Sequence, residues 1–106
     1  DRGSAPTLVF DEIDTGVGGA VADAIGARLK RLSGGVQVLA VTHAPQVAAR
    51  AATHFHIAKG EVEGNRVATR VKPLDAPARR EEIARMLSGA AITDEARAAA
   101  AKLLEA

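Results

Sequence analysis

Cysteine is absent from these 106 residues, which excludes disulfides, thiolate metal sites and a cysteine nucleophile. Aromatic residues are scarce, since Phe10 and Phe55 are the only two. No hydrophobic run approaches the roughly 18 residues of a membrane-spanning helix. Charge is balanced as well: 14 Lys and Arg against 13 Asp and Glu give +1, which removes the charge argument for a polybasic anchor or a nucleic-acid-binding tail. We therefore expect a soluble, cytoplasmic protein.

Apolar residues make up 47% of the chain, enough to build a globular core from Ala, Val, Leu and Ile. The length fits one modest domain or a piece of a larger one. The chain begins at Asp1, without a Met, in a polar stretch. We expect a fragment of a longer polypeptide.

Hydrophobic patterning predicts an α/β fold with the element order β-α-β-α-β-β-α-α. Strands are predicted at 7–10 and 36–42, the second being apolar enough to be covered on both faces. Alternating patterns at 54–57 and 66–72 flank Gly64-Asn65 and predict an antiparallel hairpin at the sheet edge. Helical spacing predicts helices at 20–32, 45–52, 78–88 and 93–104. The expected core is a parallel βαβ unit.

Acidic residues and a histidine follow the two strands of that unit. Asp11 and Glu12 end the first strand, and Thr42 and His43 end the second. A right-handed crossover makes these strands parallel, so their carboxyl ends share the edge where open α/β sheets bind ligands. Adjacent acids point to opposite sides, so one can face a metal ion and the other an attacking water, as phosphoryl transfer requires. On spacing alone, solvated turn residues are the favoured interpretation.

The segment Leu8-Val9-Phe10-Asp11-Glu12 resembles the Walker B motif of ATP-binding-cassette and SMC-type ATPases. His43 matches the switch histidine of the same superfamily. The loop from Asp14 to Gly19 occupies the place of the D-loop. The resemblance implies a partial P-loop NTPase head.

Three longer motifs narrow the resemblance to the RecN family of bacterial DNA-repair proteins. They stand in the family's order and span nearly the whole chain: 11–19 (DEIDTGVGG), 42–48 (THAPQVA) and 80–89 (REEIARMLSG). Residues 1–106 are thus expected to form the C-terminal part of one ATPase head, with the Walker B strand, the D-loop and the switch histidine.

This resemblance implies a role for each matching residue. Asp11 would help hold the Mg²⁺ of bound ATP, and Glu12 would be the general base for hydrolysis. His43 would sense the γ-phosphate. Asp14, Thr15 and Gly16 would face the partner head across the nucleotide. The cofactors implied are ATP and Mg²⁺.

The sequence departs from the superfamily's D-loop pattern at one position, and elsewhere it contains a short segment that matches the start of the signature motif. Gly18 stands where the D-loop aspartate is usual, so contacts of that aspartate cannot be transferred. Leu32-Ser33-Gly34-Gly35 spells the opening of the signature motif, but it follows a helix and feeds into a strand. We interpret it as a helix C-cap rather than a phosphate site.

A G-x-x-x-x-G-K-[ST] loop is absent, so nothing in this sequence cradles the β- and γ-phosphates. The true signature helix and the long coiled coil expected of RecN are missing too. The resemblance implies that an N-terminal half of the same polypeptide completes the head. A second head would complete the site. The resemblance also implies DNA as a partner and a cytoplasmic, nucleoid-associated location. These 106 residues alone are predicted not to hydrolyse ATP.

Several other residues have a structural interpretation that is favoured over a functional one. His54 and His56 could begin a metal site, but an exposed edge strand is the preferred interpretation. Arg79 and Arg80 could touch DNA or another chain, although a solvated helix start is preferred. Met86 is expected in the core, and Thr42 is expected to pack or hydrogen-bond locally.

Two alternative functions remain open at this stage. The chain could be half of another SMC-type or transporter ATPase head, although transporters commonly carry Pro after the Asp-Glu pair and this chain has Ile13. It could also be a non-catalytic interaction module in which the acids and the histidine are merely structural.

Overall fold

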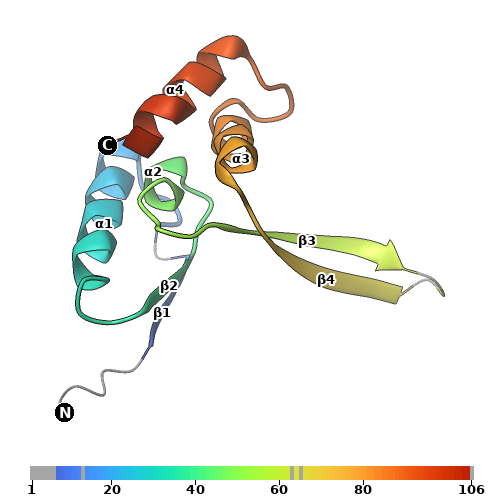
Figure 1. The fold of residues 1–106 in the computed structure, drawn as a ribbon, viewed down its shortest axis with the longest axis horizontal. Helices are drawn as coiled ribbons and strands as arrows, with labels where there is room; N and C mark the ends of the chain where they lie inside the picture. The colour runs from blue at the N-terminus through green and yellow to red at the C-terminus, as the bar shows by residue number, and fades with distance from the viewer. Residues whose placement is uncertain (1–6, 13, 63, 65, 106) are drawn as a thin grey trace.

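The computed structural model describes residues 7–12, 14–62, 64 and 66–105. Its elements follow the predicted order and are shown in Figure 1: β1 (Leu8–Asp11), α1 (Gly19–Leu32), β2 (Val38–Val41), α2 (Pro45–Ala48), β3 (Phe55–Val62), β4 (Arg66–Pro73), α3 (Ala76–Ser88) and α4 (Asp94–Glu105). Ile13, the polar stretch 1–6 and Asn65 of the predicted turn lie outside the described residues. None of the described helices is long and apolar enough to cross a membrane.

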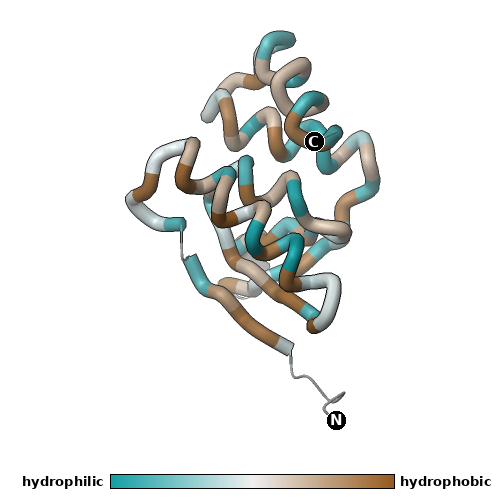
Figure 2. The backbone as a smooth tube through the Cα atoms, turned by 90° about the vertical axis from the view of Figure 1, so that its left-hand side faces the viewer, coloured by the Kyte–Doolittle hydropathy of each residue, from teal (hydrophilic) through white to brown (hydrophobic). Residues whose placement is uncertain are grey.

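Strands β1 and β2 pair in parallel, as predicted, with Leu8 opposite Val38 and Asp11 opposite Val41. Helix α1 makes the crossover between them. Its buried positions Ala22, Gly26 and Leu29 follow helical spacing and face the sheet and α2. Lys30 and Arg31 in its last turn complement the negative end of the helix dipole. In Figure 2, β1 is brown along its length and ends in the teal of the two acids.

The second strand is shorter than predicted and is not covered on both faces. Phe10 and Val38 turn toward α1 and α2. On the opposite face Val9, Leu39 and Val41 are 66%, 48% and 40% exposed. Helices α1 and α2 lie on one side only, and no described residue covers the other. The β-branched sequence correctly predicted an apolar strand, but the prediction that both faces of the strand are covered was wrong for the described residues.

The hairpin β3–β4 is antiparallel, as predicted, with Phe55 opposite Pro73 and Val62 opposite Arg66. It is not the edge of the parallel sheet: it forms a two-stranded sheet of its own. Figure 1 shows it extending away from the helices. Gly64 adopts a φ of +81° in the connection, a conformation that glycine tolerates best.

Helices α3 and α4 pack together and against α2 around a small alanine-rich core. Ile83, Ala84 and Ala100 are fully buried there, with Ala48, Ala49 and Ala96 beside them. Met86 packs on the edge of this cluster, as expected. Asp75 caps α3 by accepting a hydrogen bond from the backbone N–H of Ala78 at 2.9 Å. Because the sequence has few aromatic side chains to fill a core, the three helices must approach closely, and the small alanine side chains allow this.

Arg79 lies in the first turn of α3, but its side chain is half-buried rather than solvated. Its Nη2 donates to the carbonyl oxygens of Ala48 (3.0 Å), Ala49 (3.2 Å) and Ala51 (2.5 Å). These carbonyls lie at the C-terminal end of α2, where a helix leaves acceptors unpaired and its dipole is negative. The guanidinium therefore joins α3 to α2. The sequence prediction for this residue was wrong because the acceptors lie about 30 positions away.

His56 lies on β3, an edge strand of the two-stranded sheet, as expected, and His54 comes directly before that strand, but neither residue is fully exposed. Both are half-buried against α3, and His56 Nε2 lies 3.9 Å from Glu82 Oε1. His54 Nδ1 is buried without a hydrogen-bond partner among the described residues. Burial, with the nearby positive charge of Arg79, lowers the pKa of His54 below its ordinary value. No group of three or more potential metal ligands occurs among the residues that the structure describes.

Candidate functional site

Parallel pairing brings the predicted site residues to one edge of the β1–β2 sheet. Asp11 pairs with Val41, and the backbone N–H of Glu12 donates to the carbonyl oxygen of Val41 at 2.8 Å. The chain leaves β2 directly into His43. The expected convergence of the two strand ends is therefore present in the fold.

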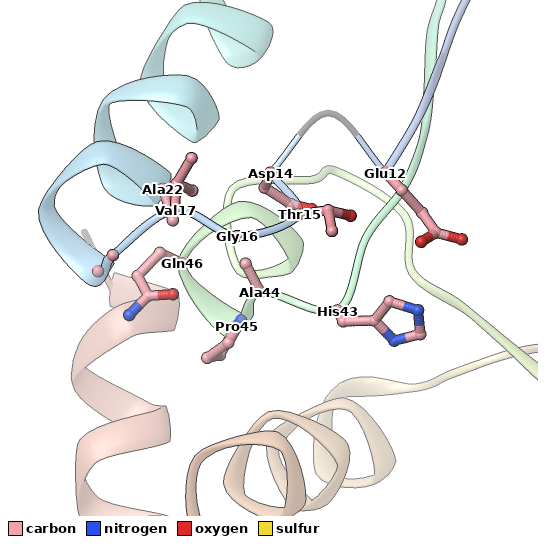
Figure 3. Close-up of a pocket in the computed structure, with 12 residues that line it drawn as sticks. Glu12, Asp14, Thr15, Gly16, Val17, Ala22, His43, Ala44, Pro45 and Gln46 are labelled. Carbon is pink, nitrogen blue, oxygen red and sulfur yellow. The ribbon is translucent and has the colours of Figure 1, made fainter.

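A pocket of about 380 Å³ lies at this edge and is shown in Figure 3. It is lined by two strand ends, the loop after β1 and the first residues of α1 and α2: Glu12, Asp14, Thr15, Gly16, Val17, Gly18, Gly19, Ala22, His43, Ala44, Pro45 and Gln46. Glu12 and His43 come from segments about 30 residues apart, and their side chains project to the same side of the pocket (Figure 3). An acid, an imidazole and a glycine-rich loop thus line the same pocket.

Glu12 has an unusual backbone conformation. Its φ is +55°, in the left-handed region, and it is the only non-glycine residue there among those described. This conformation turns the chain sharply out of β1, and the Glu12 carbonyl accepts a 3.2 Å hydrogen bond from the N–H of Thr15. A left-handed residue other than Gly, Asn or Asp stores strain, and such strain clusters at functional sites. The turn leaves the carboxylate of Glu12 exposed at the pocket rim.

Asp14 is buried, with 7% of its surface exposed, and its carboxylate accepts a hydrogen bond from Thr42 Oγ1. The same hydroxyl oxygen accepts from the backbone N–H of Ala44 at 2.9 Å. The local hydrogen bonding expected of Thr42 is therefore confirmed. The side chain of Asp14 is engaged within this chain and does not point outward. It fixes the loop after β1 to the segment that carries His43.

Thr15 and Gly16 are exposed at the tip of the same loop. Gly16 has a φ of +81°, and no atom lies within 4 Å of the place where a Cβ would stand. Two residues later Gly18 precedes α1, which begins without a side-chain cap and without an acid in its first turn. The loop therefore presents backbone rather than side chains to its surroundings. The uncapped N–H groups at the start of α1 add positive potential beside the pocket.

Asp11 lies at the end of β1, exposed, and does not contribute to the pocket wall. The alternation along β1 puts it on the open face of the sheet together with Val9. Asp11 and Glu12 thus differ in surroundings, as expected for adjacent acids on a strand. A single carboxylate suits Mg²⁺, which is usually held by one or two carboxylates and completed by substrate phosphates and water.

Gln46 is a pocket residue that sequence reasoning missed. It sits in the first turn of α2, three positions after His43, and its amide nitrogen would lie 3.2 Å from a Cβ built on Gly19. The close approach explains why glycine suits the first position of α1. The sequence feature that could have identified Gln46 as a pocket residue was its position three residues after His43.

Leu32-Ser33-Gly34-Gly35 ends α1, as predicted. Ser33 is the C-cap, and the N–H groups of Gly34 and Gly35 donate to the carbonyls of Arg31 and Leu32 at 3.2 and 3.0 Å. Because these N–H groups are used to close the helix, they do not converge on an anion. The interpretation of this segment as a cap is confirmed.

Comparison with known proteins was made for sequence and for structure. No protein-family model matches the chain. It is 52% identical over 102 residues to the DNA repair protein RecN of Xylella fastidiosa strain Temecula1, covering 96% of this chain and 18% of that protein. It is 50% identical over 99 residues to RecN of Rickettsia bellii and 48% identical over 99 residues to RecN of Bacillus subtilis strain 168. The chain spans about a fifth of the length of these relatives.

Among solved structures, one from a study of the ATP-driven dimerization and DNA-stimulated activation of SMC ATPases superposes with a TM-score of 0.65. The match covers 82% of this chain and 51% of that one at 17% sequence identity, so it bears on the fold alone. The predicted fold class is confirmed. Over nearly its whole length the chain is similar in sequence to RecN proteins, and its fold is similar to that of part of the solved SMC ATPase structure.

Proposed function

We propose that this segment is the C-terminal half of an SMC-like ATPase head that binds and hydrolyses Mg-ATP in DNA double-strand-break repair. The observation that carries the proposal is that Glu12 and His43, from the ends of two parallel strands, line one pocket with a glycine-rich loop. The similarity to RecN over 96% of the chain supports the repair context. The proposed substrate is ATP, and the proposed partner of the whole protein is DNA at the nucleoid.

Glu12 is the proposed general base. Its carboxylate is exposed at the pocket rim, where it can accept a proton from a water molecule that attacks the terminal phosphate. The left-handed turn at this residue holds the carboxylate clear of β1. A positioned base of this kind contributes about 10²–10⁴-fold to a rate.

His43 and Asp11 are the proposed partners of Glu12. His43 follows β2 and can hydrogen-bond the terminal phosphate through an imidazole nitrogen. Asp11 would hold the Mg²⁺, which when bound supplies charge neutralisation of the phosphates. Thr15 and Gly16 at the exposed loop tip would meet a second head, while Asp14 secures that loop from inside.

The remaining parts of the site are proposed to come from elsewhere. The sequence has no Walker A loop, and the relatives are more than five times longer than the matched stretch. An N-terminal half of the same polypeptide would cradle the β- and γ-phosphates. A second copy of the head would close over the nucleotide. The segment alone is therefore expected to be inactive as an ATPase.

Substituting Glu12→Gln in the complete polypeptide tests this function. We expect ATP turnover to fall about 10²–10⁴-fold while nucleotide binding persists, because the amide cannot accept the proton. Glu105→Gln, at the exposed end of α4, is the matched control and should leave turnover unchanged. A loss below about tenfold for Glu12→Gln would favour the non-catalytic interaction module instead.

A further inference from the structure

The near-zero net charge of the chain conceals a local concentration of positive charge on the hairpin. Arg66, Arg70 and Lys72 are separated by even numbers of residues along β4, so they stand on the same face of the hairpin. All three are exposed, and none makes an ion pair within the described part of the chain. We call these three residues the basic face.

The middle of the basic face carries small residues. In register, Arg70 faces Ala58 and Ala68 faces Gly60, whereas Lys72 faces His56 and Arg66 faces Val62. A Cβ on Gly60 would meet no atom within 4 Å. Around Arg70 the face is therefore largely backbone and small side chains, from which the long cationic side chain rises.

The acidic residue among the described strand residues of the hairpin does not share the parity of the basic face. Within the two strands, no position of this face carries Asp or Glu. The exposed hydrophobic residues Phe55, Ile57, Val67 and Val71 have the opposite parity and project from the other side. Glu82 of α3 lies 3.9 Å from His56 at the base of the hairpin, and its carboxylate accepts a hydrogen bond from Arg85 Nε at 2.9 Å. The three positive charges are left without an internal partner among the described residues.

The dimensions of the basic face match a linear polyanion. Arg66 and Lys72 are six residues apart, which is about 20 Å along a strand. Duplex DNA presents one phosphate charge per roughly 1.7 Å of axis, so such a length runs past about a dozen phosphates. The face lacks the Asn, Gln and aromatic side chains that read or stack on bases. Guanidinium and ammonium groups alone contact phosphates and carry no sequence information.

We propose that the basic face of the β3–β4 hairpin, formed by Arg66, Arg70 and Lys72, binds the phosphate backbone of duplex DNA without sequence preference. The proposal rests on the proposed function, in which the whole protein acts on DNA, and it gives that contact a place. The hairpin extends away from the helices and from the edge of the sheet that carries Glu12 and His43 (Figure 1). DNA on this face leaves the pocket open.

The test is a salt titration of DNA binding by the complete polypeptide, using a short fluorescein-labelled duplex and fluorescence anisotropy. The variant Arg66→Gln/Arg70→Gln/Lys72→Gln should bind at least about tenfold more weakly at low salt. Its plot of log affinity against log salt should be shallower by about 2 to 3, since each phosphate contact contributes about 0.9. Two duplexes of unrelated sequence should lose affinity equally.

Two control variants separate a specific contact from general charge or folding effects. Arg28→Gln/Lys30→Gln/Arg31→Gln removes the same charge from exposed positions of α1 and should keep the wild-type slope. Arg66→Lys/Arg70→Lys keeps the charge on the basic face and should bind DNA with the wild-type affinity and slope. The proposal is overturned if the hairpin variant keeps wild-type affinity and slope, or if the α1 variant loses as much.

Basal ATP hydrolysis without DNA, measured on the same preparations, distinguishes this proposal from the proposed function. The hairpin residues are remote from the pocket, so the hairpin variant should hydrolyse ATP at the wild-type rate. If wild type and variants all lack hydrolysis, the ATPase function is wrong, and the DNA titration still decides the hairpin contact. If hydrolysis is normal and the DNA titration is unchanged, only the hairpin contact is wrong.

Discussion

The hydroxyl of Thr42 donates a hydrogen bond to the carboxylate of Asp14, which precedes it by 28 positions. Asp14 belongs to the loop after β1, and Thr42 stands beside His43 at the end of β2. Because Asp14 is buried, this hydrogen bond compensates a carboxylate that has left water. It ties together the two segments that form the candidate pocket.

Thr42→Val is expected to destabilise the fold by about 1–3 kcal/mol, because it leaves a buried acceptor without its donor. Thr42→Ser keeps the hydroxyl and should recover most of that loss. Denaturant unfolding of the complete polypeptide measures both. A double-mutant cycle with Asp14→Ala should give a coupling of about 0.5–3 kcal/mol. Additive effects would mean that the two side chains do not act as a pair.

Arg79→Met is expected to cost about 1.5–3 kcal/mol, because a charged donor is removed from the carbonyls that end α2. Methionine retains most of the aliphatic bulk, so the loss reports the hydrogen bonds. Arg80→Met, at the exposed neighbouring position, is the matched control and should change stability by less than about 0.5 kcal/mol. Equal midpoints of denaturant unfolding for the two variants would contradict this role of Arg79.

Asp11→Asn is expected to raise the Mg²⁺ concentration needed for half-maximal ATP hydrolysis by at least about tenfold, because a charged oxygen ligand is lost. Asp23→Asn, whose parent side chain is half exposed and pairs with Arg50, is the control. The measurement is a Mg²⁺ titration of turnover in the complete polypeptide. An unchanged Mg²⁺ dependence would remove Asp11 from the proposed ligands.

Acidification is expected to weaken the packing of the β3 start on α3. Burial first, and then the charge of Arg79, lower the pKa of His54, while Glu82 opposes this and His56 adds to it. The unfolded chain therefore takes up a proton near the ordinary value of 6.5 before the folded chain does. Stability should fall as the pH drops below about 6.5, by less than about 1.4 kcal/mol per pH unit.

His54→Gln tests this expectation, because glutamine does not titrate. The variant should show a flatter dependence of unfolding free energy on pH between neutral and mildly acidic conditions. Thr53→Ala, an exposed neighbour without a titrating group, should retain the slope of the wild type. The same slope in wild type and His54→Gln would show that another group is responsible.

Elements with strong local patterns could be predicted from the sequence. The spacing of Ala22 and Leu29 predicts α1, and the alternation around Ile57 and Val71 predicts the hairpin, because each pattern reflects one face of one element. The convergence of Glu12 and His43 was also predictable, since a parallel βαβ unit fixes which strand ends meet.

Relationships between elements could not be predicted in the same way. Arg79 was misread because its acceptors are backbone carbonyls, which leave no trace in the amino-acid sequence. The exposure of Leu39 and Val41 was not predicted. Apolar side chains indicate that burial of a strand is favourable, but they do not identify the element that would cover it. Asp14 was expected to face a partner head, and its burial was missed because its donor, Thr42, lies 28 positions away in the sequence.

The left-handed backbone of Glu12 restricts what substitutions at that position can reveal. A β-branched replacement such as Val or Thr would have to adopt a conformation that its side chain strongly disfavours, whatever its chemistry. Loss of activity in such a variant would therefore mix a distorted turn with a missing carboxylate. Gln, Asn and Gly are the informative replacements. If position 12 were randomised, we expect few other residues to preserve the turn.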